Sequence, residues 1–171
     1  MSLGQIGLWI NGLVIYDGWD GSSYESLGVW QQNAYYWEGV SFDSCLGHPD
    51  GNGIYHSHIN INCYYSYNDS SAHSPIIGYL FDSFPIYGPF GYSSANNSNS
   101  SIIRMTSGYA LRDITDRTTL SDGTVLNSTY YGPPINATYL LGAYIQDYYY
   151  AGTGTLDEYN GRWCVTPECE Y

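Results

Sequence analysis

The stretch Ile6-Gly-Leu-Trp-Ile-Asn-Gly-Leu-Val-Ile-Tyr-Asp17 places an Asn11-Gly12 pair between two apolar runs. A two-residue turn of type I′ requires positive φ at both central positions, and Asn-Gly is among the pairs that meet this requirement best. Alternating apolar runs on either side of such a pair are typical of strands. The sequence therefore predicts a β-hairpin with a two-residue turn over residues 6–17.

The same pattern recurs further along the chain. Residues 77–88, Ile-Gly-Tyr-Leu-Phe-Asp-Ser-Phe-Pro-Ile-Tyr-Gly, align with residues 6–17 without gaps, and Ile, Gly, Ile and Tyr are identical. Asp82-Ser83 is a weaker turn signal than Asn11-Gly12, and Pro85 restricts its strand to a sheet edge or a bulge. We predict two related hairpins; the alternative is a chance likeness between two apolar-turn-apolar stretches.

The rest of the chain also favours strands and turns. Residues 29–39 allow one short helical turn, residues 102–112 are compatible with helix or strand, and residues 111–126 indicate strand, turn, strand. Few stretches show the 3.6-residue apolar period of a helix. We expect a mostly β fold: a single compact domain of short antiparallel strands and long loops, with at most short helices.

The composition is unusual in its charge. The 171 residues include four basic residues, all arginine, against sixteen acids, which gives a net charge of -12. Such a surface repels nucleic acid and anionic membranes and attracts divalent cations or basic partners. No stretch approaches the roughly 20 consecutive apolar residues of a membrane span. We therefore expect no nucleic-acid partner and no membrane span.

All four histidines lie between His48 and His73. His56 and His58 are separated by one residue, so in a strand they point to the same face about 7 Å apart, within reach of one ion. Other imidazoles and carboxylates lie close by in sequence. The predicted metal ligands are His56 and His58 with His48, His73 and Asp43, and Asp50 and Asp82 are further carboxylates.

The identity of the metal depends on which ligands join the pair. A set rich in imidazole favours copper or zinc, whereas a set rich in carboxylate favours calcium or manganese. We expect a divalent metal ion, with copper or zinc favoured and calcium left open. The alternative is that the histidines are structural, buried and neutral, and hydrogen-bonded to backbone carbonyls or carboxylates.

The four cysteines form two local pairs, Cys45 with Cys63 and Cys164 with Cys169. Four thiols allow three connectivities, and we predict the local one. A Cys45–Cys63 bridge would close a loop around the histidine segment and stabilise the fold by roughly 3 kcal/mol. Zinc ligation by these cysteines is the alternative.

Five Asn-x-Ser/Thr sequons point to an extracellular location. They begin at Asn68, Asn96, Asn99, Asn127 and Asn136. Together with an even number of cysteines they indicate an oxidising compartment, so N-linked glycans are expected partners. The alternative is that a chain rich in asparagine and serine forms sequons by chance.

Signatures of common enzymes are missing from the sequence. It contains no P-loop, dinucleotide fingerprint, Gly-x-Ser-x-Gly elbow or His-Glu-x-x-His motif. The later acids Asp147, Asp157 and Glu158 have no evident catalytic partner, and we expect them to be solvated turn carboxylates. The sequence therefore does not identify an enzyme.

Several characteristic runs are spread over most of the chain: Phe42–Pro49, Tyr55-His56-Ser57-His58, His73–Tyr79, Phe84–Pro89, Leu111–Asp116 and Gly154–Gly161. As a set, these runs resemble the YHYH-domain family of extracellular proteins. The resemblance implies a secreted domain, often suspected of binding metal, without a defined substrate. Ser57 departs from it, because the third position of the signature is tyrosine. Cys169 also stands where no family cysteine is expected, which weakens its pairing with Cys164.

The resemblance further implies that the family domain begins earlier and ends later than this chain. We expect residues 1–171 to be a single YHYH-like domain, truncated at both ends. Its expected function is that of a secreted, glycosylated, metal-binding module in an extracellular assembly, formed by self-assembly or with other extracellular proteins. Two alternatives stay open: a fibre or coat subunit with structural histidines, and a copper or zinc enzyme acting on extracellular polysaccharide.

Overall fold

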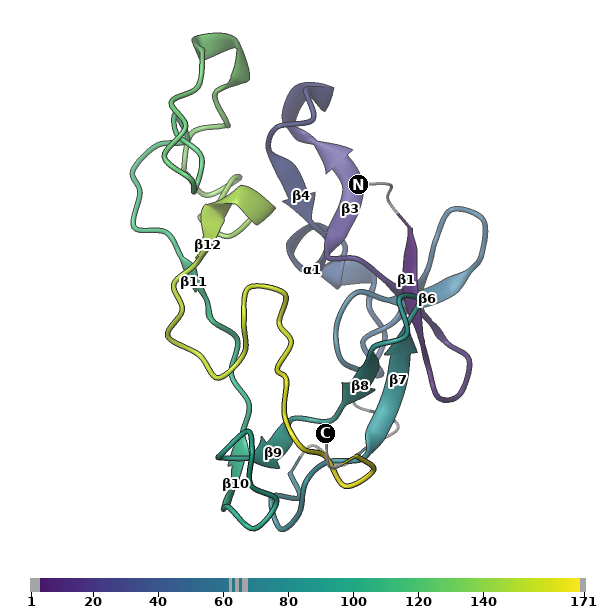
Figure 1. Cartoon of the computed structure of the whole chain (residues 1–171). Helices are drawn as coiled ribbons and strands as arrows, with labels where there is room; N and C mark the ends of the chain where they lie inside the picture. Colours follow the sequence, from purple (N-terminus) through teal and green to yellow (C-terminus); the bar gives the residue numbers. More distant parts are fainter. Residues whose placement is uncertain (1–3, 62, 64, 66–67, 170–171) are drawn as a thin grey trace.

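The computed structural model describes residues 4–61, 63, 65 and 68–169, and in them the fold is mostly β, with short strands, long loops and short helices, as predicted (Figure 1). The strands are β1 (Gln5–Trp9), β2 (Val14–Tyr16), β3 (Trp19–Ser23), β4 (Gln31–Asn33), β5 (His48–Pro49), β6 (Tyr55–Ser57), β7 (Ile76–Leu80), β8 (Pro85–Tyr87), β9 (Phe90–Tyr92), β10 (Ile102–Arg104), β11 (Tyr109–Leu111) and β12 (Tyr148–Tyr150). The helices are α1 (Ala34–Trp37) and the 3-10 turns η1 (Tyr24–Ser26), η2 (Gly39–Ser41), η3 (Ser128–Tyr130) and η4 (Ile145–Asp147). Within this described part, no helix is long and apolar enough to cross a membrane.

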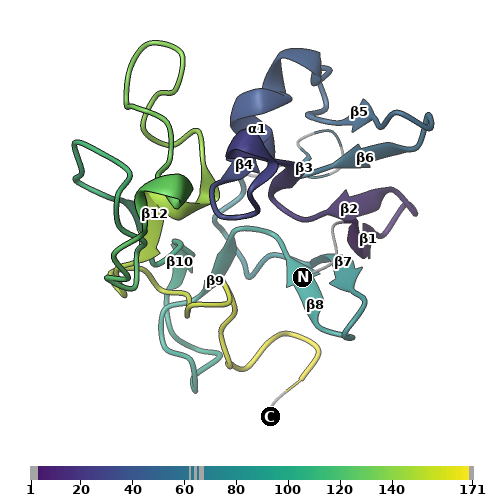
Figure 2. The same ribbon diagram turned by 90° about the horizontal axis from the view of Figure 1, so that it is seen from above.

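Both predicted hairpins belong to the main sheet. Its six strands follow the order β5-β6-β2-β1-β7-β8, so the β1–β2 and β7–β8 hairpins are joined through an antiparallel β1–β7 pair. Pro85 opens β8, which is an edge strand as predicted. In Figure 2 this sheet occupies one side of the molecule and the segment around β12 the other.

The turns of both hairpins differ from the predicted two-residue type. Each loop has three residues, because the amide of Trp9 donates to Leu13 O (2.9 Å) and the amide of Leu80 to Phe84 O (2.9 Å). Only the last loop residue has positive φ, which is 85° at Gly12 and 76° at Ser83. This is the geometry of a type I turn followed by one left-handed residue.

The two hairpins are equivalent residue by residue at an offset of 71 positions. Gln5 pairs with Tyr16 as Ile76 pairs with Tyr87, and both hairpins have a register shift just after these pairs. The equivalent residues Leu8 and Tyr79 pair with each other across β1 and β7. A local twofold axis therefore passes between them, and the predicted relation of the hairpins is confirmed.

The repeat extends beyond the stretch in which the sequences look alike. Trp19 pairs with Asn33 in β3–β4 as Phe90 pairs with Arg104 in β9–β10, again at the same offset. The amide of Ala34 donates to Gly18 O (2.9 Å), and the equivalent amide of Met105 donates to Pro89 O (2.7 Å). We call residues 4–34 the first unit and residues 75–105 the second unit.

The predictions for the remaining helices and strands are confirmed in part. Helix α1 lies in the stretch that allowed a helical turn, and residues 102–112 form the strands β10 and β11. Residues 119 and 125 form an isolated antiparallel bridge around Gly123, so the strand-turn-strand expected there is reduced to a turn with one bridge. The upstream part of that stretch, β11, pairs with β12 instead.

The core consists of two clusters. One lies under the main sheet and contains Trp9, Ile15, Ile61 and Ile77, with contributions from both units. The other packs Trp30 of the first unit against Ala143 and Tyr144 from a later segment. The later segment is therefore part of the fold and covers the first unit.

A buried ion pair anchors that later segment and corrects the expectation for Asp147. Its carboxylate is fully buried and accepts from Arg117 Nε (2.7 Å) and Nη2 (2.8 Å), as well as from the backbone amides of Gly142 and Tyr144. Arg117 also donates to three backbone carbonyls. Asp147 is thus a structural counter-ion and not a solvated turn carboxylate.

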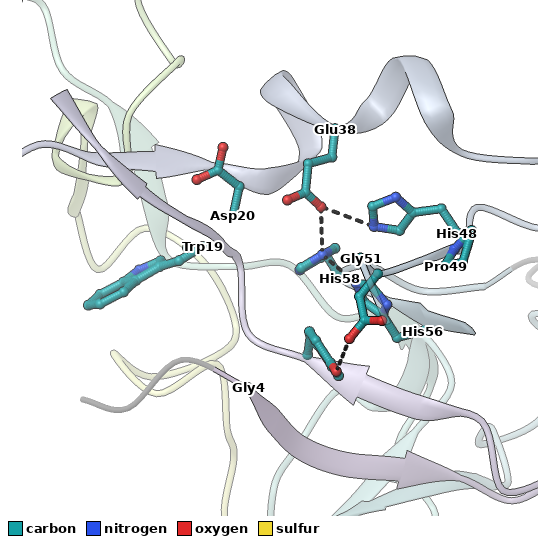
Figure 3. A pocket seen from close by; sticks show the side chains of 12 residues that line it. Gly4, Trp19, Asp20, Glu38, His48, Pro49, Gly51, His56 and His58 are labelled. Atoms are coloured by element: carbon teal, nitrogen blue, oxygen red, sulfur yellow. Dashed lines mark hydrogen bonds and ion pairs between the residues drawn. The ribbon is translucent and has the colours of Figure 1, made fainter. Parts of the chain in front are cut away.

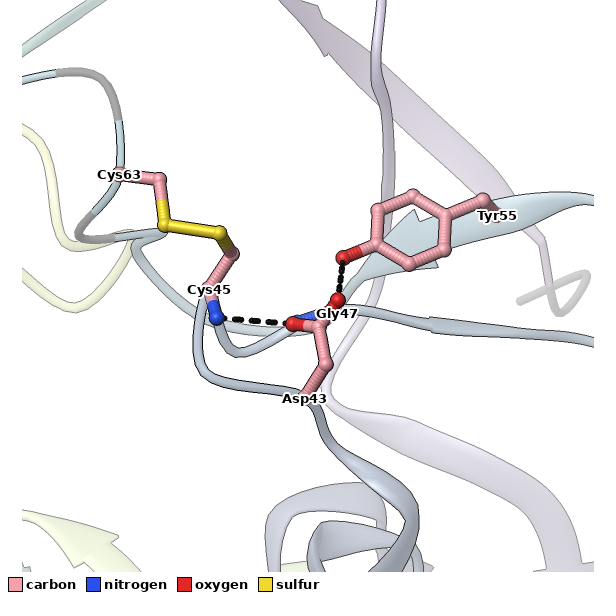
Figure 4. Close-up of a disulfide and its surroundings, with 5 residues drawn as sticks. All are labelled: Asp43, Cys45, Gly47, Tyr55 and Cys63. Carbon is pink, nitrogen blue, oxygen red and sulfur yellow. Dashed lines mark hydrogen bonds between the residues drawn. A yellow bond between two sulfur atoms is a disulfide. The ribbon is translucent and has the colours of Figure 1, made fainter.

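The structure forms one of the two expected disulfides. Cys45 and Cys63 are bonded, next to a turn in which Asp43 accepts from the amide of Cys45 (Figure 4). Cys164 and Cys169 are free thiols, contrary to the predicted pairing. Thr166 and Cys169 lie opposite each other in an isolated antiparallel bridge. Cys164 comes two residues before Thr166 and therefore does not lie opposite Cys169.

Candidate metal centre

Three of the four histidines converge beside the first unit. His48 and His56 are directly opposite each other in the antiparallel β5–β6 pair, and His58 follows β6 by one residue. Strand β6 runs parallel to β2, which places the histidines next to the first hairpin. Glu38 joins them from the C-terminal end of α1 (Figure 3).

The side chains of this cluster approach one another closely. Glu38 Oε2 lies 3.0 Å from His48 Nε2 and 3.0 Å from His58 Nε2. His56 Nε2 lies 3.0 Å from His58 Nε2. One potential ligand atom from each of the four residues lies within 4.8 Å of all the others. We call Glu38, His48, His56 and His58 the His/Glu cluster.

Backbone carbonyls determine which nitrogen carries the proton in two of these imidazoles. His58 Nδ1 lies 2.5 Å from Asp17 O, and His56 Nδ1 lies 3.0 Å from Ile54 O. A carbonyl oxygen only accepts, so each Nδ1 must donate its proton. In the neutral ring, Nε2 then carries a lone pair and no proton in both residues.

The Ser41 hydroxyl determines which ring nitrogen of His48 carries the proton. The Ser41 hydroxyl donates to Glu38 O (2.7 Å), so its oxygen accepts from His48 Nδ1 at 2.7 Å. The Nε2 atom of His48 therefore also carries a lone pair and no proton in the neutral ring. It is buried and has no hydrogen-bond partner among the residues that the structure describes. Its short distance to Glu38 brings two acceptors together, which explains why it forms no hydrogen bond.

The cluster therefore directs four electron pairs at one point. Three imidazole lone pairs and one carboxylate oxygen lie within 4.8 Å of one another, three of their separations are 3.0 Å, and no proton lies between them when the rings are neutral. Histidine ligands of metals are commonly held by donation from the other ring nitrogen, as all three are here. Only a cation, either a metal ion or added protons, relieves this arrangement.

Burial adjusts the protonation of two members of the cluster. Burial lowers the pKa of His48, and the neighbouring imidazoles lower it further. Burial also raises the pKa of Glu38, and the charge of Asp20 raises it further. Both changes disfavour isolated charges at this site. A divalent cation would reverse the effect on Glu38, since an opposite charge favours the ionised carboxylate.

Aromatic and small residues support the histidines. Tyr16 stacks on His56 with ring centroids 3.9 Å apart, and its hydroxyl donates to Asp50 at 3.2 Å. On the opposite face of β6, Ser57 is buried and accepts from Trp9 Nε1 at 2.8 Å. Ser57 therefore belongs to the core and leaves the two flanking histidines on the cluster face.

A cavity of about 440 Å³ opens beside the His/Glu cluster. Its walls carry the acids Asp20, Glu38 and Asp50 and the aromatic residues Tyr16 and Trp19, as well as the three histidines of the cluster. Of the residues that the structure describes, no arginine lines the cavity, and the sequence contains no lysine.

Two of the predicted metal ligands lie elsewhere. His73 packs between Tyr87 and Tyr92 of the second unit, and its Nδ1 bonds to Ser74 O (2.8 Å). Asp43 is exposed and accepts from the Tyr55 hydroxyl (2.5 Å) and from turn amides. The structure therefore brings His48, His56 and His58 together without His73 or Asp43. Asp43 caps a turn, and His73 packs on the second unit.

Sequence reasoning missed Glu38. This residue follows an aromatic stretch and lies ten residues before His48, so no short motif connects it to the histidines. The one available signal was the short helix that the sequence allowed at residues 29–39. Of the other two carboxylates considered, Asp50 lines the cavity, and Asp82 caps the turn of the second hairpin by accepting from Phe84 N (3.3 Å).

All five sequon asparagines are exposed. They are Asn68, Asn96, Asn99, Asn127 and Asn136. Asn127 and Asn136 also accept hydrogen bonds from the amides of the threonines that complete their sequons, at 3.0 and 2.8 Å. Exposure makes glycan attachment sterically feasible at each position.

Comparison with known proteins identifies the family to which the chain belongs. The family model described as "YHYH protein" matches residues 1–171. The chain belongs to the YHYH protein family. The runs that resemble this family include the Tyr55–His58 segment, which supplies two of the histidines in the cluster. Searches among curated proteins and among solved structures found no match.

Proposed function

We propose that this member of the YHYH family is a secreted metal-binding module that holds a divalent transition-metal ion through Glu38, His48, His56 and His58. One observation carries the proposal. Three imidazoles are held by their Nδ1 atoms so that three Nε2 lone pairs and a carboxylate converge within 4.8 Å. Structural histidines would instead be expected to have partners that donate to these nitrogens.

The donor set favours zinc or copper over calcium. Imidazole suits zinc and copper, whereas calcium takes six to eight oxygen ligands. The cluster offers three nitrogens and one carboxylate. Three histidines and one acid can complete a tetrahedral zinc shell, and the neighbouring cavity leaves space for a further ligand.

The ion would have a structural effect as well as a binding role. It would connect α1 to β5 and β6; along the chain, α1 is linked to β5 through the loop that contains Cys45 of the disulfide. The disulfide and the exposed sequons support an oxidising, extracellular location with N-linked glycans. The edge strands β5 and β8 could pair with a strand of another chain in an extracellular assembly.

The proposal is tested on protein secreted from a eukaryotic host and purified without chelators or metal-affinity resin. Elemental analysis by mass spectrometry should find about one zinc or copper ion per chain. His58→Gln should lose this ion because it removes the nitrogen that faces both Glu38 and His56. His73→Gln is the matched control and should retain it. Metal-free native protein that also fails to take up zinc or copper in calorimetric titration would disprove the proposal.

A further inference from the structure

We infer that the cavity beside the His/Glu cluster binds a neutral, hydroxyl-rich ligand, namely a sugar unit of an uncharged oligosaccharide. The inference rests on the proposed function, because the metal ion would form one wall of this binding site. It adds the chemical class of the ligand, which follows from the size of the cavity, its charges and its aromatic walls.

The size of the cavity argues for a ligand larger than water. A purely structural metal site is closed by its ligands and needs no adjoining space. Here about 440 Å³ adjoins three imidazoles and Glu38. One water in the liquid occupies about 30 Å³, and small-molecule sites typically span about 300–1,000 Å³. The cavity is therefore in the range of a small organic ligand.

The charges around the cavity argue against anions. Asp20, Glu38 and Asp50 line it, whereas none of the arginines does, and the sequence contains no lysine. The four arginines are occupied elsewhere: Arg117 by Asp147, Arg112 and Arg162 by backbone carbonyls, and Arg104 by the ring of Phe90. Phosphorylated, sulfated or carboxylated ligands would thus meet three carboxylates and no guanidinium, and with a divalent ion bound these groups would still leave one net negative charge at the cavity.

The same charges do not favour a cationic ligand once the metal is bound. A divalent ion would neutralise two of the three carboxylates and would itself repel an ammonium group at short range. Hydroxyl groups avoid both problems, because they donate to carboxylates and also coordinate metal ions through oxygen.

Aromatic side chains complete a surface suited to sugars. Trp19 and Tyr16 line the cavity, and three glycines, Gly4, Gly21 and Gly51, contribute no side chains to its wall. A sugar ring has an apolar face of C–H groups and an edge of hydroxyls. The flat indole can accept the apolar face, while Asp20 accepts from the hydroxyls.

The test measures binding of hexasaccharides to the zinc-loaded protein by isothermal titration calorimetry. The neutral probes are cellohexaose, xylohexaose and the chitin hexamer, the anionic probe is hexagalacturonate, and the cationic probe is the glucosamine hexamer. At least one neutral probe should bind at least tenfold more tightly than the anionic and cationic probes. Removal of zinc with a chelator should weaken that binding at least tenfold.

Two variants locate the binding site. Trp19→Ala should weaken the neutral probe at least tenfold without changing the zinc stoichiometry, and Trp163→Ala, which removes an exposed indole outside the cavity, should not. Gly51→Phe should block the cavity while the fold is kept, because a Cβ at that position meets no atom within 4 Å.

The outcomes separate this inference from the proposed function. One zinc per chain with no neutral probe bound, or with hexagalacturonate bound as tightly, would overturn the ligand class and leave the metal site standing. A chain that takes up no metal would overturn both. Unchanged binding in both Trp19→Ala and Gly51→Phe would show that the oligosaccharide binds outside the cavity and would also overturn the inference.

Discussion

The first unit and the second unit share a backbone but place different chemistry on it. In both, a tyrosine at the end of the hairpin meets a histidine edge-on: Tyr16 meets His58 at 5.9 Å, and its equivalent Tyr87 meets His73 at 5.2 Å. Asp20 of the first unit corresponds to Gly91 of the second, and a Cβ at Gly91 would lie 3.5 Å from His73 Nε2. The second unit thus presents a histidine without the acid that accompanies it in the first.

The segments that cover the two units differ as well. Trp30 of the first unit packs on Tyr144 and lies under the buried Arg117–Asp147 pair, whereas the equivalent of Trp30 in the second unit is Ser101. The second unit is held by backbone and arginine contacts from residues 162–165. A repeated backbone therefore does not dictate how each copy is stabilised.

The largest difference should appear when the arginines of the two covers are removed. Arg117→Met should lower the free energy of unfolding by about 3–5 kcal/mol, because it leaves the Asp147 carboxylate buried without a counter-ion. Arg162→Met should cost about 1–2 kcal/mol, because it loses hydrogen bonds to Tyr92 O and Ser93 O without stranding a charge. Urea unfolding followed by tryptophan fluorescence measures both. Equal losses would show that the two covers are energetically alike.

The disulfides provide the next test. Cys45→Ser with Cys63→Ser should cost about 3 kcal/mol, since the bond closes a loop with a sequence separation of 18 residues. Cys164→Ser with Cys169→Ser should change stability by less than about 0.5 kcal/mol, because both are free thiols. A comparable loss in the second pair, together with a Cys164–Cys169 link in peptide mapping under non-reducing conditions, would restore the pairing expected from the sequence.

Metal should stabilise the protein through the His/Glu cluster beside the first unit, without a contribution from His73. Zinc at a hundredfold excess over its dissociation constant should add about 2.7 kcal/mol to the free energy of unfolding. Differential scanning calorimetry should show this increase in the parent protein and in His73→Gln, and the increase should be missing in His58→Gln. Loss of the zinc effect in His73→Gln would mean that the histidine packed on the second unit takes part in the site.

A smaller effect concerns the aromatic cover of the first unit. Within the described part of the chain the Tyr144 hydroxyl is buried without a hydrogen-bond partner, so Tyr144→Phe should raise stability by about 1 kcal/mol at pH 7. Burial raises the pKa of Tyr144 to about 12, from 10 for an ordinary tyrosine. The unfolded chain loses this proton first as pH rises, so the parent protein should lose stability between pH 10 and 12.

The variant Tyr144→Phe should lose less stability over the same alkaline range, as measured by urea unfolding at each pH. Tyr159→Phe serves as the control because that ring is exposed. A destabilised Tyr144→Phe would mean that the hydroxyl has a partner, such as a buried water, and that the cover of the first unit depends on polar contacts.

The sequence predicted those features of the fold and of the site that depend on residues close together in the chain. The Asn11 and Asp82 turns identified both hairpins, and the spacing of His56 and His58 located two members of the cluster. Glu38 and the Arg117–Asp147 pair were missed because contacts between distant segments create them, and no periodicity records such contacts. The extension of the repeat into β3–β4 and β9–β10 was also hidden. Backbone hydrogen bonds preserve it, while little of the sequence beyond Ser22-Ser23 and Ser93-Ser94 is shared.

The smallest effect tests the equivalence of the two hairpins directly. Gly12 and Ser83 occupy the same left-handed position, with φ of 85° and 76°. Ser83→Gly should stabilise the protein by about 1 kcal/mol, because glycine adopts this conformation without the steric cost that serine meets. Gly12→Ser should destabilise it by a similar amount. The double variant should match the parent protein in urea unfolding if the turns are energetically equivalent, and a clear imbalance would show that one turn is held by contacts that the other lacks.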